Sequence, residues 1–296
     1  MSKKKLAKPL NILMIDDNKE FAETLQREAN PHRVRLECYT NLEDGLEVLQ
    51  AKSERYFAGV ILDVICLKDR NQKIARADFI TTAIQEFDRR APSLPKVILT
   101  GDPDRVKFVK ELYEGNTKVF YKSSDIEAMF TYLIQKSLNL PHVKFARKFP
   151  DVFEIFENNF LGHEVELSLV RCLEKMDNVE RTVVDDNLGR LRRLQEEIYL
   201  ALNRHDPDIV LTNDIEKNGP QCRRIMAHLV KKDFAERDKI IDRGADLIYS
   251  IASDYGSHVP NTEPKYSPTR YTVQMCTYAI LDQLLWFKSM VDSRER

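Results

Sequence analysis

Short apolar runs alternate with amphipathic stretches through the first 140 residues of the chain. The runs are rich in Val, Ile and Leu and have the length of strands, whereas the stretches between them repeat apolar residues every three or four positions, as helices do. Strands are predicted at 10–16, 34–39, 56–64, 96–100 and 118–121, and helices at 18–29, 41–53, 78–90, 104–114 and 125–139. This alternation predicts an α/β fold with a five-stranded, doubly wound, mostly parallel sheet.

The strand pattern ends near residue 140, and the remaining pattern is helical. Apolar residues that step by three or four positions predict a long helix at about 179–204: Leu188, Leu191, Leu194, Ile198 and Leu202. Further helices are predicted at 151–159, 163–176, 219–230 and 233–253, with a last one near the end of the chain. We therefore predict an α/β domain over 1–140, a linker over 141–150, where prolines flank a mixed segment, and a mostly α-helical domain over 151–296.

Composition and charge exclude several classes of protein. The 296 residues include 46 Lys+Arg and 47 Asp+Glu, a formal net charge of -1. Neither half has the basic excess typical of nucleic-acid binding, and no compact helix-turn-helix is evident, so DNA binding is not expected. No apolar run reaches the roughly 20 residues that span a bilayer. The five scattered cysteines form no Cys-x-x-Cys pair, which favours a reducing, cytoplasmic setting.

Polar residues lie at the end of four of the predicted strands, or directly after it. The first strand ends in Asp16 and Asp17, the third contains Asp63 near its end, the fourth ends in Thr100, and Lys122 follows the fifth. Ligands of open α/β sheets collect at the carboxyl ends of the strands, so these side chains are predicted to share one edge. Crowded carboxylates favour a hard cation such as Mg²⁺, and a carboxylate beside it can act as a nucleophile toward a phosphoryl group.

These residues, in their strand contexts, resemble the CheY-like receiver domain of two-component response regulators. Asp16-Asp17 follows LNILMI, Asp63 lies in GVILDV, Thr100 in VILTG, and Lys122 in KVFYK. The order and the spacings match the family's pattern over about residues 9–140, nearly half the chain. The resemblance implies a flavodoxin-like receiver sheet and a signalling role in a phosphorelay.

The resemblance also implies a role for each residue. Asp63 corresponds to the phosphoacceptor, which becomes an aspartyl phosphate. The Mg²⁺ ligands correspond to Asp16, Asp17, Asp63 and the backbone carbonyl of Ile65, and the residues that sense and stabilise the phosphoryl group to Thr100 and Lys122. The implied partner is a histidine kinase or a phosphotransfer protein. The chain is then a phosphoacceptor rather than an enzyme.

Three positions depart from the family's pattern. The segment 66–78, after the predicted phosphoacceptor, is longer and more basic than usual, so we expect an unusual dephosphorylation rate or partner choice. The switch aromatic of the family corresponds to Val119, and the proline that usually follows the lysine corresponds to Ser123. Whether the threonine–aromatic switch operates is therefore open.

The helical half has no assembled catalytic motif, which favours a protein-interaction domain that relays the signal. Arg223, Arg224 and His228 resemble the Arg-x4–6-His motif of HEPN-type ribonucleases, so a receiver-gated nuclease is an alternative. The favoured interpretation is a helix with exposed arginines and a half-buried His228. A homodimer through the long helix and the apolar last helix is also open.

A third alternative is a phosphate sink, a receiver that drains phosphoryl groups from a kinase and has little output of its own. The segment Ser253-Asp-Tyr-Gly-Ser-His258 resembles a segment of abortive-infection-type proteins, which implies a phage-defence (antiviral) setting and makes His258 a candidate for contacting a ligand. The favoured interpretation of this segment is a helix that ends at Gly256.

Overall fold

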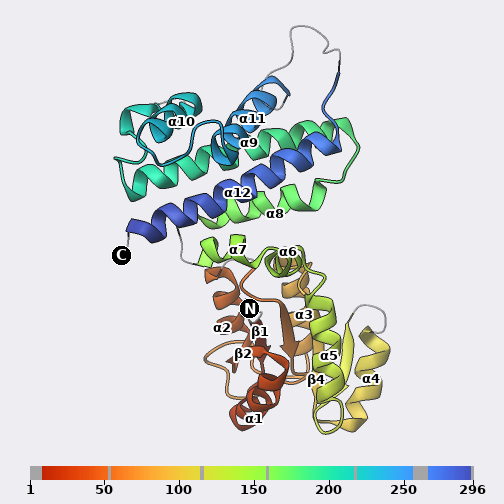
Figure 1. The fold of residues 1–296 in the computed structure, drawn as a ribbon. Helices are drawn as coiled ribbons and strands as arrows, with labels where there is room; N and C mark the ends of the chain where they lie inside the picture. Colours follow the sequence, from red (N-terminus) through yellow and green to blue (C-terminus); the bar gives the residue numbers. More distant parts are fainter. Residues whose placement is uncertain are drawn as a thin grey trace. The chain divides into compact units, whose positions relative to one another are not determined.

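A computed structural model gives the fold over residues 9–52, 55–113, 117–157, 160–216, 219–255 and 266–294. The chain divides into two compact units, Met1–Arg147 and Lys148–Arg296, and each is described by itself. Figure 1 shows the elements of both units.

The first unit is built on a five-stranded parallel sheet. The strands are β1 (Leu10–Ile15), β2 (Val34–Tyr39), β3 (Gly59–Leu62), β4 (Lys96–Thr100) and β5 (Lys118–Tyr121). Their order in the sheet is β2-β1-β3-β4-β5, and all four neighbouring pairs are parallel. This is the flavodoxin-like order, so the predicted fold class of the first half is confirmed.

Helices cover both faces of the sheet because the central strands β1, β3 and β4 carry apolar residues on both sides. The helices are α1 (Lys19–Ala29), α2 (Leu42–Ala51), α3 (Phe79–Arg90), α4 (Pro103–Tyr113) and α5 (Ile126–Ser137). Leu13 and Ile15 of β1 pack into a core with α2, α3 and α4, whereas Ile12 and Met14 pack into a second core with α1 and α5. Successive residues of one strand thus serve opposite faces.

The outer edge of the sheet is partly covered by one side chain. β2 lies at the edge, and its outward backbone groups include the Leu36 N–H and the Val34 carbonyl. Gln26 of α1 accepts from the Leu36 N–H at 2.8 Å and donates to the Val34 carbonyl at 3.4 Å. Its amide therefore bonds to the strand much as a neighbouring strand would.

The segment expected to be a linker is helical. It forms α6 (Pro141–Lys148) and the start of α7 (Pro150–Glu157), and the division between the two units falls at the end of α6. Proline suits the first turn of a helix, where no backbone N–H is needed, so Pro141 and Pro150 start helices here rather than excluding them. Val143 of α6 is buried in the core of the first unit.

The second unit is a bundle whose central element is a long helix, α9 (Arg181–His205). It packs against α8 (His163–Lys175), α11 (Ile240–Tyr255) and α12 (Arg270–Arg294), and α10 (Cys222–Lys231) packs on α11. The apolar stripe predicted from the sequence is buried on α9: Leu188, Leu191, Leu194, Ile198 and Leu202. The prediction of a mostly helical second half is confirmed.

The second unit also contains a short sheet. A two-stranded antiparallel sheet, β6 (Ile215–Glu216) and β7 (Gly219–Pro220), precedes α10, although the pattern predicted no strand in this half. Each strand has two residues, too few to produce a detectable alternation.

Among the described residues, no helix is both long enough and apolar enough to cross a membrane.

Two glycines in contrasting surroundings test this packing. A Cβ on Gly59 of β3 would lie 2.8 Å from Leu133 Cδ1, so Gly59→Ala should lower the free energy of unfolding by about 1–3 kcal/mol. The matched control is Gly244→Ala in α11, whose Cβ would lie 3.5 Å from the Cβ of Ala279; there we expect a gain of about 0.5–1 kcal/mol. Denaturant unfolding of the full-length chain measures both. Equal effects of the two substitutions would contradict the close approach of α5 to β3.

Candidate functional site

The carboxyl ends of β1 and β3 bring three carboxylates together. Asp16, Asp17 and Asp63 each place a carboxylate oxygen within 4.8 Å of the others. Asp16 is buried, Asp63 is half-buried and Asp17 is exposed. The cluster therefore has one open side, through which a cation and a substrate can enter, and it has the oxygen donors that a hard divalent cation requires.

A lysine from the end of β5 reaches into this cluster. Lys122 Nζ lies 2.6 Å from Asp16 Oδ2 and 3.3 Å from Asp63 Oδ1. Its ammonium also lies 4.5 Å from the centre of the Phe21 ring of α1, a cation–π distance. Only 17% of the Lys122 side chain is exposed, so little of its charge is left to solvent.

Backbone hydrogen bonds extend the sheet into the site and fix these positions. The Asp16 N–H donates to the Tyr39 carbonyl and the Asp63 N–H to the Ile15 carbonyl, both at 3.0 Å. The Lys122 N–H donates to the Thr100 carbonyl at 2.8 Å. Each functional residue is thus the first residue beyond a strand and still bonded to its neighbour, which aligns the side chains more firmly than a free loop would.

Thr100 ends β4, the strand between β3 and β5. It is buried, and its hydroxyl accepts from the Asp102 N–H at 3.2 Å, which leaves the hydroxyl hydrogen available to another acceptor. Val119 corresponds in the sequence to the switch aromatic of receiver domains. It is an aliphatic side chain buried in the core, so this position has no ring that could move between the core and the surface. Ser123 follows Lys122 in a turn.

Burial and mutual repulsion shift the titration of these groups. Burial, with the charge of Asp16, raises the pKa of Asp63 to about 7. The same two causes raise the pKa of Asp17. Burial works to lower the pKa of Lys122, but the charges of Asp63 and Asp16 outweigh it and the pKa is raised. The site therefore holds more negative charge than its one ammonium compensates, and a second cation would relieve this repulsion.

The segment that follows Asp63 is braced against α2 by backbone and ionic contacts. Leu42 and Glu43 at the start of α2 donate backbone hydrogen bonds to the carbonyls of Leu67 and Lys68, both at 3.0 Å. Arg70 forms ion pairs with Asp44 and Glu47 of the same helix. Ile65 lies in the bend between Asp63 and these contacts. Arg70, one of the basic residues that made this segment unusual in the sequence, thus anchors it to an acidic helix.

In the second unit the structure separates Arg223 from His228, whereas Arg224, at i+4 from His228 in α10, lies on the same helix face. His228 lies at i+5 from Arg223, which turns it about 140° around a helix of 100° per residue, so the two do not share a face. The His228 ring pairs with the Asp208 carbonyl at 3.1 Å, whereas Arg223 faces Asp246 and Tyr249 of α11. Arg224 is exposed on α10. His258 lies outside the described residues.

Two contributions to the first unit's site went unnoticed in the sequence. Phe21 packs its ring against Lys122, and Arg70 fixes the segment after Asp63. Neither residue lies at the end of a strand, so the strand-end pattern does not reveal them. In the second unit, a charged pocket between α10 and α11 also went unnoticed. Its residues on α11, Asp242, Asp246 and Tyr249, recur at i, i+4 and i+7, so one polar helix face was the available signal.

Comparisons by sequence found nothing: no family model matches the chain, and no curated protein does. Comparison of structures found receiver domains over the N-terminal half. One is the signal receiver domain of an HD domain-containing protein from Pseudomonas fluorescens Pf-5, at 20% identity and a TM-score of 0.36, covering 50% of this chain and 98% of that one. Another is a response regulator receiver domain protein from Clostridium thermocellum, at 17% identity and a TM-score of 0.35, covering 43% and 94%.

A third similar structure is the Mn²⁺-bound form of response regulator Rcp1, at 19% identity and a TM-score of 0.30, covering 44% of this chain and 94% of that one. Two of these three solved structures are thus receiver domains, and the third is a response regulator. At these identities and TM-scores the similarity carries no functional argument, so the function proposed below depends on the residues of the site.

The raised pKa of Asp63 predicts a pH-dependent effect on stability. The folded pKa of about 7 exceeds the ordinary 3.8, so the metal-free protein loses stability from this group as pH rises from about 4 to 7. Asp63→Asn removes that loss and should raise the midpoint of thermal unfolding by at least about 2 °C at pH 7.5. The gain should shrink toward zero at pH 4.5. Calorimetry with a chelator present measures both, and a gain that is larger at pH 4.5 would contradict the repulsion described.

Proposed function

We propose that the first unit is a phosphoacceptor domain that takes a phosphoryl group on Asp63, with Mg²⁺ as cofactor. The observation that carries this proposal is the arrangement of three carboxylates and Lys122 at one end of the sheet. The donor is a histidine kinase or a phosphotransfer protein, and the chain acts as a response regulator. It is not itself an enzyme in this proposal.

The residues present fit a divalent cation. Asp63, Asp16 and Asp17 offer oxygen ligands within 4.8 Å of one another, and the carbonyl of Ile65 is a further candidate ligand two residues after Asp63. Among the described residues, Lys122 is the cation that pairs with these carboxylates, so one positive charge faces three acidic groups. A bound Mg²⁺ would offset the charge of the carboxylates and of the incoming phosphoryl oxygens.

The residues of the chain then each contribute to phosphoryl transfer. An ionised carboxylate oxygen of Asp63 attacks the phosphorus atom, and the bond from phosphorus to the donor's imidazole nitrogen breaks. The imidazole leaves with the electron pair, and an acyl phosphate remains on Asp63. The Lys122 ammonium, already 3.3 Å from Asp63, can donate to an oxygen of the bound phosphoryl group. The Thr100 hydroxyl can donate to another.

The second unit is proposed to relay the phosphorylation state by contact with another protein. A phosphate sink stays an alternative, and it is favoured by Val119, since a buried valine in place of the switch aromatic weakens the usual coupling. The ribonuclease alternative gains no support from Arg223, because Arg223 and His228 face different neighbours, and it stays an untested alternative for Arg224. A phage-defence setting and a homodimer are untested proposals.

Phosphorylation can be tested by the mass of the intact protein. After incubation with acetyl phosphate and Mg²⁺, the wild-type chain should gain the mass of one phosphoryl group, and Asp63→Asn should gain none. The matched control is Asp88→Asn, which removes an exposed carboxylate of α3 that pairs with Lys96, and it should be modified like the wild type. Modification of Asp63→Asn to the wild-type extent would refute Asp63 as the acceptor.

Metal binding can be tested separately from phosphorylation. Asp17→Asn removes an exposed carboxylate of the cluster, and we expect it to weaken Mg²⁺ binding at least about tenfold, which corresponds to about 1.4 kcal/mol. Asp125→Asn, at the N-cap of α5 and outside the cluster, is the control. Isothermal titration of the full-length chain with Mg²⁺ gives both affinities. If the two variants bind Mg²⁺ equally well, Asp17 is not a ligand.

A further inference from the structure

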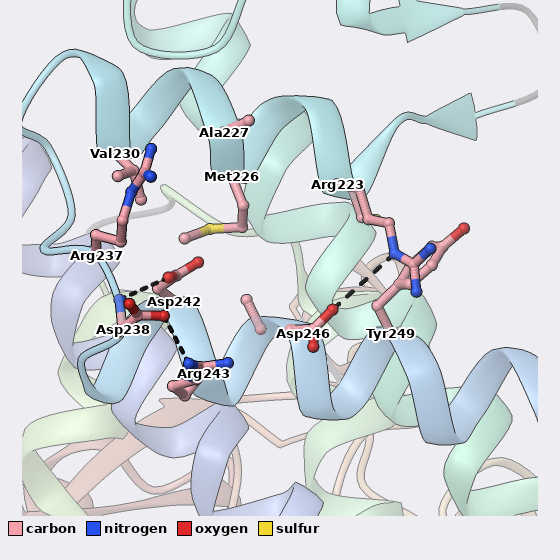
Figure 2. Close-up of a pocket in the computed structure, with 12 residues that line it drawn as sticks. Arg223, Met226, Ala227, Val230, Arg237, Asp238, Asp242, Arg243, Asp246 and Tyr249 are labelled. Carbon is pink, nitrogen blue, oxygen red and sulfur yellow. Dashed lines mark hydrogen bonds and ion pairs between the residues drawn. The ribbon is translucent and has the colours of Figure 1, made fainter.

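A pocket in the second unit has no part in the proposed phosphoryl transfer. It lies between α10 and α11, with a volume of about 320 Å³ (Figure 2). Its floor is apolar, formed by Cys222 and Met226 of α10 and Ala245 of α11, all of them buried. An apolar floor with polar groups around it is typical of sites for small molecules.

The rim holds three guanidinium groups and three carboxylates, and two of the guanidinium groups, those of Arg223 and Arg237, are incompletely paired. Arg243 is bound to Asp238 at 2.6 Å, so its charge is satisfied. Arg223, by contrast, lies 4.0 Å from Asp246, too far for a hydrogen bond. Within the part of the chain that the structure describes, Arg237 makes no hydrogen bond or ion pair. Figure 2 shows Arg223 at one end of the pocket and Arg237 at the other, with Asp246 between them.

At one end of the pocket, two guanidinium groups lie over one aromatic ring. The Arg223 guanidinium lies over the Tyr249 ring at 5.0 Å, and Arg192 of α9 lies over the same ring at 5.5 Å. Arg192 is itself held by Glu196 at 3.0 Å and Ser253 at 3.1 Å. Tyr249 is thereby fixed in place, and the Arg223 side chain, 70% exposed, presents a flat cationic surface to the pocket.

These groups select a ligand by charge, shape and size. Unfilled guanidinium donors favour an anion, and guanidinium planes stack well on nucleobases. The Asp246 carboxylate can accept from the N–H groups of a base or the hydroxyls of a ribose. A pocket of about 320 Å³ is at the lower end of the range for small-molecule sites, which suits one nucleotide rather than a dinucleotide. We propose that the pocket between α10 and α11 binds a mononucleotide, its base on Arg223 and its phosphate at Arg237.

Equilibrium dialysis of the full-length chain against AMP, GMP, CMP and UMP, each alone, tests this proposal. Inorganic phosphate and phenylalanine serve as probes for an anion without a base and for a ring without a phosphate. At least one nucleotide should bind saturably at one site, and phosphate and phenylalanine should each bind at least about tenfold more weakly, a difference of about 1.4 kcal/mol.

Substitutions then locate the site. Arg223→Gln and Arg237→Gln should each weaken nucleotide binding at least about tenfold. Arg224→Gln removes an exposed arginine of the same helix that does not line the pocket, and it should change the affinity less than about twofold. All three positions are exposed, and thermal unfolding confirms that each variant is folded.

Three results would overturn the proposal. The first is that none of the four nucleotides binds saturably with a dissociation constant below about 1 mM. The second is that phenylalanine binds as tightly as the best nucleotide, which would assign the pocket to an amino acid. The third is that Arg224→Gln weakens binding as much as Arg223→Gln, which would indicate nonspecific attraction to a basic surface.

Discussion

The parallel orientation of five strands is the constraint on which the proposed phosphoacceptor site depends. Because every strand ends at the same edge, residues more than 100 positions apart, such as Asp16 and Lys122, come within 2.6 Å of each other. Helices cover both faces of the sheet, so Asp16 and Asp63 at its edge lose part of their contact with water. The cluster is therefore destabilising by itself, and the repulsion that raises the pKa of Asp63 is what makes the site receptive to a cation.

The sequence predicted the site best where a strand and its functional residue are adjacent in the chain. Asp63 directly follows an apolar run, so the prediction of the strand also placed the carboxylate. The sequence was least informative where a site is assembled by tertiary packing. The pocket of the second unit depends on Arg192, which is 57 positions from Tyr249 and is placed by the pairing of two helices that no local pattern specifies. Prolines misled the interpretation at 141–150, since Pro141 and Pro150 each begin a helix instead of interrupting one.

The core of the second unit is unusually polar along the central helix. Gln195 is fully buried, and its amide donates to the Ala245 carbonyl at 3.0 Å and to Gln283 at 3.4 Å, which links α9 to α11 and α12. The Gln195 Nε2 donor is satisfied only where α9, α11 and α12 take this alignment, whereas Gln195 Oε1 and Gln283 Nε2 are buried without a hydrogen-bond partner among the described residues. Since Ala245 also forms the floor of the pocket, the alignment that the core selects is the one that shapes the pocket.

The contact between Gln26 and β2 has a consequence beyond the fold of one molecule. An exposed edge strand is a template on which a strand of another chain can add, and such additions begin many aggregates. By occupying the Leu36 N–H and the Val34 carbonyl, Gln26 removes the hydrogen-bonding positions that an incoming strand would need first. A single amide on α1 thus protects the outer edge of β2 from pairing with a strand of another molecule.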